Sequence, residues 1–186
     1  MLQLYLMRHA KSDWNNYDGN DLKRKVSPIG EKKTKLTKEF ILSKNFLPDH
    51  VWCSPSIRTK ETLGILADMF SDKINIEYKD QLYNHGMETI DTLIIKSEIY
   101  KKNTSVKKLL VIGHEPFMSN SVQALTKDRD NLNVKSALNK FSTSSFFAFQ
   151  FNTDSWYEIS EFNSEPLTHF RPCLLYTSPS PRDVEE

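Results

Sequence analysis

The stretch LQLYLMRH, residues 2–9, indicates the fold class of this chain. Residues 2–7 carry no charge and are mostly Leu, Tyr and Met, a composition typical of a β-strand that is covered on both faces. Arg8 and His9 follow at once. The stretch therefore predicts a buried strand with two polar side chains at its carboxyl end.

A second segment repeats this pattern. Residues 51–53, VWC, predict a short apolar strand, and Ser54-Pro55 indicates a helix cap followed by a proline at the first helical position. This spacing places Arg58 in the first turns of the predicted helix. An arginine is therefore expected near the carboxyl end of the second strand.

A third segment has the same order of strand, polar turn and helix. Residues 109–112, LLVI, predict the most clearly buried strand of the chain. His114 follows this strand, and Pro116 stands where a helix would begin. Each of the three turns or helix starts thus carries an arginine or a histidine.

Apolar spacing predicts the remaining elements. Ser27 as a cap and Pro28 at the first helical position begin a helix that runs to about Lys44, after a polar surface loop over residues 11–26. Two helices are expected to bury apolar faces, made of Ile29, Leu36 and Phe40 and of Ile57, Leu66 and Phe70. Further expected elements are strands over 74–78, 146–151 and 156–162, a helix over 90–97, and a hairpin-like turn over 152–155.

The alternation of strands and helices predicts a three-layer α/β/α sandwich. Its sheet should be mostly parallel, with an antiparallel strand near the C-terminal end. With 186 residues, of which 38% are hydrophobic, the chain has the size and composition of one soluble domain, which we place at residues 1–172. We find no repeat or linker that would divide this domain.

The last segment, CLLYTSPSPRDVEE (residues 173–186), differs from the rest of the chain. It contains two prolines, little periodicity and no partner element. CLLYTSPSPRD also resembles the translation of a sequencing-library adapter, which would make the segment a cloning or assembly scar. The alternative is a disordered native tail. If the segment is a scar, Cys53 is the only native cysteine.

The charge balance argues against two classes of partner. The 25 basic and 24 acidic residues give a net charge of +1, so no global field attracts nucleic acid or an anionic membrane. Residues 2–7 are too few for a secretory signal or a membrane span. Two cysteines without a spacing motif indicate a reducing compartment. We therefore expect a cytoplasmic protein.

The polar residues at the three strand ends are expected to share one crevice, because ligands of open α/β sheets bind beyond the carboxyl ends of the strands. These residues are Arg8, His9, Arg58 and His114. Free N–H groups at the helix starts favour an anion, and two guanidiniums supply donors that match phosphate oxygens. The predicted ligand is a phosphoryl group.

The same residues indicate a histidine nucleophile. The pocket contains no evident base to activate a serine or cysteine and no carboxylate cluster, so we expect neither a metal nor a cofactor. An imidazole can attack phosphorus when one ring nitrogen is neutral and the other is held by an acceptor. We expect His9 to attack, while Arg8, Arg58 and a protonated His114 stabilise the phosphoryl oxygens. Two candidate additional phosphate ligands follow in the loop, Lys11 and Ser12.

Three segments carry a family resemblance: MRHAKSDW (7–14), CSPSIRTKET (53–62) and VIGHEP (111–116). In order and spacing they resemble the histidine phosphatase superfamily, and the first has the form typical of its SixA-like phosphohistidine phosphatase branch. The stretch from Arg24 to Gly30 also fits the family, and the resemblance extends over about residues 2–171. It implies a phosphoglycerate mutase-like fold and a phosphohistidine intermediate.

The resemblance also implies a role for each matching residue. It makes His9 the nucleophile, Arg8 and Arg58 phosphate ligands, and His114 the second imidazole of the pocket. One position departs from the family. Relatives often place a glutamate soon after the Leu-Tyr pair that matches residues 82–83, and in mutase-like members a carboxylate near there donates a proton. This chain has Asn84, with His85 and Glu88 as nearby substitutes.

The departure favours phosphohistidine in proteins as the substrate, because a leaving imidazole needs less help from an acid than a sugar alkoxide does. The compact length agrees, since superfamily members that act on sugar phosphates generally carry larger insertions; the longest candidate lid here is residues 15–25. The alternatives are a small-molecule phosphomonoesterase and a phosphate- or phosphohistidine-binding module without turnover. The partner would be a phosphorylated protein or a small phosphorylated metabolite.

Several other polar residues have structural interpretations. His50 and His169 are expected at the surface, without a catalytic role. Cys53 is expected to be a small buried side chain. Four lysines within residues 32–38 predict a solvated helix face or a docking patch for an acidic partner.

Overall fold

The computed structural model describes residues 1–15, 17–83, 88–101 and 104–173. Over these residues the chain forms a six-stranded sheet in the order β3-β2-β4-β1-β5-β6. Its strands are β1 (Leu2–Arg8), β2 (His50–Cys53), β3 (Asn75–Tyr78), β4 (Lys108–Gly113), β5 (Phe146–Phe151) and β6 (Ser164–Phe170). β1 to β4 run parallel, and β5 is antiparallel to both β1 and β6. The predicted mostly parallel sheet is confirmed.

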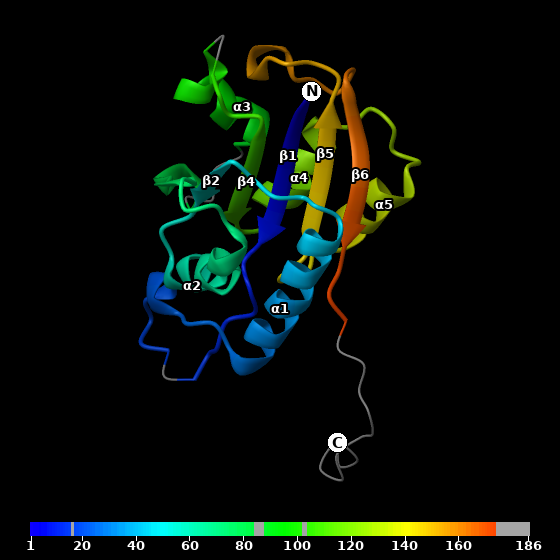
Figure 1. Ribbon diagram of the computed structural model, residues 1–186. Coiled ribbons are helices and arrows are strands. Elements are labelled where there is room, and N and C mark those ends of the chain that lie inside the picture. Colours follow the sequence, from blue (N-terminus) through cyan, green and yellow to red (C-terminus); the bar gives the residue numbers. More distant parts are fainter. Residues whose placement is uncertain (16, 84–87, 102–103, 174–186) are drawn as a thin grey trace.

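Helices cover both faces of the sheet, as the three-layer prediction requires. They are α1 (Pro28–Ser43), α2 (Ile57–Leu66), α3 (Ile90–Ile95), α4 (Phe117–Ala124) and α5 (Leu132–Asn139). Figure 1 shows α1 and α2 in front of the sheet and α4 and α5 behind it. None of the helices in the described part of the chain is long and apolar enough to cross a membrane.

The central strand β1 is buried on both faces, as predicted from its composition. Leu4 and Leu6 belong to a hydrophobic cluster that includes residues of α4 and α5, whereas Tyr5 and Met7 belong to a second cluster that includes residues of α1 and α2. This division follows from the alternation of side chains along a strand. Since β4 and β5 flank β1, its carboxyl end is held between two neighbouring strands.

The buried face of α1 differs from the prediction. The three expected residues are only half-buried: Ile29, Leu36 and Phe40. The buried residues are Gly30, Thr34, Thr37 and Ile41. The Thr34 Oγ1 lies 2.9 Å from Ser144 Oγ, and the Thr37 hydroxyl donates to the Ser144 carbonyl at 2.7 Å. These hydrogen bonds compensate for burying the two threonines, which a search for apolar spacing overlooks.

Gly30 allows α1 to approach the backbone that follows His9. A Cβ at this position would lie 2.3 Å from the Lys11 carbonyl oxygen. We expect Gly30→Ala to destabilise the protein by about 1–3 kcal/mol in urea unfolding, because backbone must move to relieve the clash. Gly64→Ala in α2 is the control, since its Cβ would meet nothing within 4 Å. Equal stability changes in the two variants would contradict the requirement for glycine at position 30.

The start of α2 lies two residues later than predicted. Ser56, and not Ser54, caps the helix by accepting a hydrogen bond from the Thr59 N–H. Ser54 instead bonds to His114. Of the expected apolar face only Leu66 is buried, together with Arg58, Thr59, Thr62 and Leu63. Arg58 thus occupies the second position of the helix and is directed into the protein.

The predicted strand over residues 156–162 is wrong. Residues Trp156–Glu158 form a short 3-10 turn, and the last strand is β6. Trp156 is buried and its indole N–H donates to the Val106 carbonyl at 2.8 Å, whereas Phe162 is 73% exposed. The apolar residues of this stretch therefore reflect packing on the core by Trp156 and, in part, by Ile159, and not a strand. β6 contains Pro166, which is tolerated because β6 is an edge strand.

The structure places three residues that the sequence predicted to be structural, and one residue of the expected tail. His50 is buried and not at the surface; its Nε2 lies 2.6 Å from a Glu77 carboxylate oxygen on the neighbouring strand β3. His169 is half-buried, with Nδ1 2.8 Å from Ser136 Oγ. Cys53 is buried, as expected. Of the expected tail, 173–186, only Cys173 lies within the described residues.

Candidate active site

The parallel strands bring the four predicted residues together at the carboxyl ends of the strands. Arg8 ends β1, and His9 and His114 follow β1 and β4 directly. The rings of His9 and His114 have centroids 5.0 Å apart. Nη2 of Arg58 lies 3.2 Å from Nδ1 of His114. The sequence therefore placed these residues correctly at a common edge, which is the lower end of β1 in Figure 1.

The geometry of His9 determines which ring nitrogen carries a proton. His9 is 7% exposed, and its Nδ1 lies 2.6 Å from the carbonyl oxygen of Ala10. Because a carbonyl oxygen can only accept, Nδ1 is the protonated nitrogen. In the neutral ring Nε2 then keeps its lone pair. The neighbouring residue thus supplies the acceptor that a nucleophilic imidazole requires.

The surroundings keep His9 neutral. Burial lowers its pKa most; the hydrogen bond to Ala10 opposes this shift, and the positive charges of Arg58, Arg8 and Arg24 lower the pKa further, to about 3. Three guanidiniums around one neutral imidazole make a site that favours an anion.

We expect the His9 ring to show no titration between pH 5 and 8 in histidine NMR spectra of the folded protein. In the unfolded chain the same ring should titrate near pH 6.5, which the urea-unfolded protein provides as a control. Below that pH the unfolded chain binds a proton at His9 that the folded chain does not bind. His9 therefore makes the free energy of unfolding fall as the pH drops from 6.5 toward 3. A titration midpoint near pH 6.5 for His9 in the folded protein would contradict the conclusion that its surroundings keep the ring neutral.

His114 contacts Ser54, which follows β2, and Arg58, which lies in α2. Its Nε2 lies 2.8 Å from Ser54 Oγ, and its Nδ1 faces the Arg58 guanidinium. A guanidinium has only N–H donors, so Nδ1 must be unprotonated in this contact. The expected protonated His114 therefore does not match this arrangement. The imidazole instead has an unprotonated nitrogen beside Arg58.

Arg58 is fixed by Asp21, a residue that the sequence did not single out. Arg58 is 3% exposed; its Nη1 donates to the Asp21 carbonyl at 2.7 Å and its Nη2 to the Asp21 carboxylate at 2.8 Å. The same carboxylate accepts from the Arg24 Nε at 2.9 Å and from the Tyr83 hydroxyl at 3.1 Å. Partial burial would raise the Asp21 pKa, but the hydrogen bonds and charges of Arg58 and Arg24 lower it to about 2.

We expect Asp21→Asn to lower kcat/KM for an aryl phosphate by about tenfold, because one charge-assisted acceptor for two guanidiniums is lost. Steady-state kinetics measures this effect. Asp18→Asn is the matched control. Asp18 lies in the same loop but is exposed; its carboxylate accepts from the Asn20 backbone N–H at 3.0 Å and lies 3.8 Å from the Lys23 Nζ, and neither partner is an arginine of the site. If both variants keep full activity, Asp21 has no part in positioning Arg58.

Arg8 and Arg58 retain unused hydrogen-bonding capacity. The Arg8 Nη1 donates to the Phe141 carbonyl at 2.9 Å. Within the described residues, however, the buried Nε atoms of both arginines have no hydrogen-bond partner. Burial lowers the Arg8 pKa, Glu115 raises it and the charge of Arg58 lowers it. Buried guanidinium donors without a protein acceptor are suited to an anionic ligand.

Lys11 and Ser12, the two additional candidates, differ in their surroundings. Lys11 is exposed. Ser12 is buried, and its hydroxyl accepts from the Arg24 Nη1 at 2.8 Å. Arg24, which the sequence indicated only through the family resemblance, therefore connects Ser12 to Asp21 and thus to Arg58.

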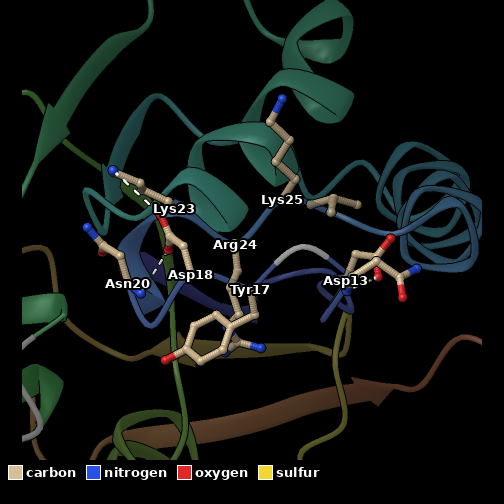
Figure 2. A pocket seen from close by; sticks show the side chains of 9 residues that line it. Asp13, Tyr17, Asp18, Asn20, Lys23, Arg24 and Lys25 are labelled. Atoms are coloured by element: carbon tan, nitrogen blue, oxygen red, sulfur yellow. Dashed lines mark hydrogen bonds and ion pairs between the residues drawn. The ribbon is translucent and has the colours of Figure 1, made fainter.

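The loop that follows His9 is closed at its base, which its polar composition did not predict. Ser12 forms a β-bridge with Val26, and the Asp13 N–H donates to the Lys25 carbonyl at 2.8 Å. Residues of the loop line an open hollow of about 410 Å³. Figure 2 shows Arg24 among the lining side chains, with Asp18 joined to Lys23. Arg24 also packs over Trp14, with 3.9 Å from its guanidinium carbon to the ring centroid.

Only one of the candidate proton donors lies in the described part of the chain. Asn84 and His85 lie outside the described residues. Glu88 is half-buried and forms an ion pair with Lys96. Nowhere in the described ranges do three or more His, Cys, Asp or Glu side chains gather as a metal site would require.

Comparison with known proteins identifies relatives of the whole arrangement. A family model described as the histidine phosphatase superfamily (branch 1) matches residues 4–126, a range that contains all four predicted site residues. A comparison with curated protein sequences finds no match.

Solved structures share the fold. The candidate phosphohistidine phosphatase SixA of Nakamurella multipartitia aligns with a TM-score of 0.75 and 21% identity, over 93% of this chain and 97% of its own. The protein histidine phosphatase SixA complexed with tungstate aligns with a TM-score of 0.71 and 20% identity, over 92% and 98%. A phosphoserine phosphatase of Entamoeba histolytica aligns less closely, with a TM-score of 0.57 and 13% identity, over 91% and 96%. At these identities the likeness establishes the fold.

Proposed function

The chain belongs to the histidine phosphatase superfamily, and from this premise we propose that it is a metal-independent phosphatase of the cytoplasm that acts on phosphohistidine in proteins. The observation that carries the proposal is the contact between His9 Nδ1 and the Ala10 carbonyl at 2.6 Å. This contact leaves Nε2 as a neutral nucleophile amid positive charge. A domain over residues 1–172 would contain all the residues required.

In the first step, Nε2 of His9 forms a bond to phosphorus while the bond from phosphorus to the substrate nitrogen breaks. The departing imidazole takes the electron pair and leaves as a neutral ring when its other nitrogen carries a proton. Arg8 and Arg58 bind the phosphoryl oxygens with donors that have no acceptor within the described part of the chain. Positioning and electrostatic stabilisation then supply most of the rate enhancement.

In the second step, the oxygen of a water molecule forms a bond to phosphorus while the bond between phosphorus and Nε2 breaks. The electron pair of the broken bond stays on Nε2, both protons of the water leave with the inorganic phosphate, and His9 returns to its neutral form with Nδ1 still donating to Ala10. His114 would be the second imidazole of the pocket. Its unprotonated Nδ1 accepts from Arg58, and its ring lies beside the ring of His9. Lys11 and Ser12 stay candidate phosphate ligands, Ser12 through its link to Arg24.

The proposed substrate is phosphohistidine because its leaving group needs little protonation. Relatives often place a glutamate where this chain has Asn84, and Glu88, the candidate substitute within the described residues, forms an ion pair with Lys96. The greater likeness to SixA structures than to the phosphoserine phosphatase supports the same choice at the level of the fold.

The test compares phosphohistidine-bearing protein with a panel of sugar and nucleotide monophosphates, using release of inorganic phosphate as the readout. We expect kcat/KM to be highest for phosphohistidine. A clear preference for monoesters would instead identify a small-molecule phosphomonoesterase. Binding of phosphorylated ligands without any release of phosphate would identify a binding module.

A further inference from the structure

A basic hollow lies beside the candidate active site, between the first helix and the end of the last strand. It has a volume of about 430 Å³, and its lining includes Ile29, Lys33, Lys140, Ser142, Arg171 and Pro172. Lys33 belongs to α1, Lys140 and Ser142 to the segment between α5 and β5, and Arg171 follows β6. Three segments distant in sequence thus contribute one cation each.

Within the described ranges, the three cations of the hollow have no ion-pair partner. The lining contains no acidic residue, and none of the three cations has a carboxylate within ion-pair distance in the described ranges. Other lysines of α1 do have partners: Lys35 pairs with Glu31, and Lys38 with Asp68. Uncompensated like charges repel one another, so this arrangement favours an anionic ligand.

The hollow adjoins the phosphate-binding residues through the backbone. Lys140 and Ser142 flank Phe141, whose carbonyl accepts from the Arg8 Nη1 at 2.9 Å. Ser144, two residues further on, donates its N–H to the carbonyl oxygens of Arg8 and His9 at 3.2 and 3.1 Å. The segment that lines the hollow is therefore also hydrogen-bonded to Arg8 and His9.

We propose that this hollow, defined by Lys33, Lys140 and Arg171, docks an acidic segment of the phosphorylated protein substrate. The proposal rests on the proposed function, since only a protein substrate reaches both the phosphate pocket and the adjoining hollow. Charge complementarity supports an acidic partner, because the described part of the lining offers three cations and no acid. Such charges increase the rate of association and select the partner more than they strengthen the complex.

The test uses two synthetic peptides with one chemically phosphorylated histidine, flanked either by acidic residues or by glutamines. The triple variant Lys33→Gln, Lys140→Gln, Arg171→Gln removes the charge of the hollow. The control triple variant Lys44→Gln, Lys73→Gln, Lys127→Gln removes the same number of charges from exposed positions outside the lining. Both variants have equal net charge. Any difference between them in peptide hydrolysis therefore depends on where the charges lie and not on how many there are.

We expect the wild-type protein to favour the acidic peptide in kcat/KM by about tenfold at low salt, from three partly exposed charge pairs. The hollow variant should lose this preference and the control variant should keep it. Hydrolysis of a small aryl phosphate should be the same in all three proteins. A preference that survives in the hollow variant, or an equal loss in the control variant, overturns the proposal.

A binding measurement separates this proposal from the proposed function. Fluorescence anisotropy with the unphosphorylated acidic peptide requires no turnover, and its affinity should fall about tenfold in the hollow variant alone. If neither phosphopeptide is hydrolysed but this difference persists, the substrate assignment fails and the docking site stands. If both phosphopeptides are hydrolysed without any difference in binding, the docking site fails and the substrate assignment stands.

Discussion

Replacing His9 by alanine is expected to lower kcat for phosphohistidine and for an aryl phosphate by about 10⁴-fold or more, because removal of a covalent nucleophile leaves only positioning and charge. The structure gives the physical basis. The ring is fixed by the Ala10 carbonyl at Nδ1, and burial together with three guanidiniums keeps it neutral. Stopped turnover with labelled substrate should also trap acid-labile phosphate on the wild-type protein and none on the variant.

The control for this experiment is His50→Gln. His50 is as buried as His9, but it is the first residue of β2 and so lies at the amino ends of the parallel strands, away from the site. There it pairs with Glu77. The control variant should keep its activity even if its stability falls. Residual activity of His9→Ala within tenfold of wild type, or acid-labile phosphate still bound to it, would show that another residue attacks phosphorus.

The sequence was informative about the fold where strands are buried on both faces. β1 and β4 are continuous apolar runs, and such runs predict central strands directly. It was misleading near the edge strand β6. Residues 156–162 contain the buried Trp156 and the partly buried Ile159 but form no strand, whereas β6 carries polar residues and a proline. An edge strand is half-exposed, so its hydrophobic pattern is weak.

The part of the site that lies at the ends of central strands could be predicted from the sequence. His9 and His114 stand directly after central strands, so the topology of the sheet brings them together. Asp21 was not predictable, because its role depends on how a polar loop folds back onto α2. Its carboxylate looks in sequence like any surface aspartate, and only the contact with a 3% exposed Arg58 distinguishes it.

The threonines of α1 show the same limit in the packing. Thr34 and Thr37 are buried because Ser144 offers them hydrogen-bond partners, and Ser144 in turn bonds to the backbone of Arg8 and His9. The polar face of this helix thus supports the site through one serine. Patterns of apolar residues contain no information on such contacts, because the hydrogen bonds form only after the chain has folded.

Replacing Arg58 by alanine is expected to lower kcat by about 10²–10³-fold, because a preorganised donor to the phosphoryl oxygens is removed from a buried site. The variant also removes the hydrogen bond from Arg58 to Nδ1 of His114, while Asp21 keeps Arg24 and Tyr83 as partners. The Asp21 loop should therefore stay in place, and the loss should lie in catalysis more than in folding. Steady-state kinetics and urea unfolding together measure the two effects.

Arg58→Lys separates charge from geometry, since an ammonium keeps the charge but cannot supply two parallel N–H groups. We expect it to recover only a small part of the lost activity. Lys60→Ala, an exposed cation on the same helix, is the control and should match wild type. Full recovery in Arg58→Lys would mean that charge alone binds the phosphoryl group. An equal loss in Lys60→Ala would mean that α2 acts through its overall charge, and Arg58 would then have no special place in the site.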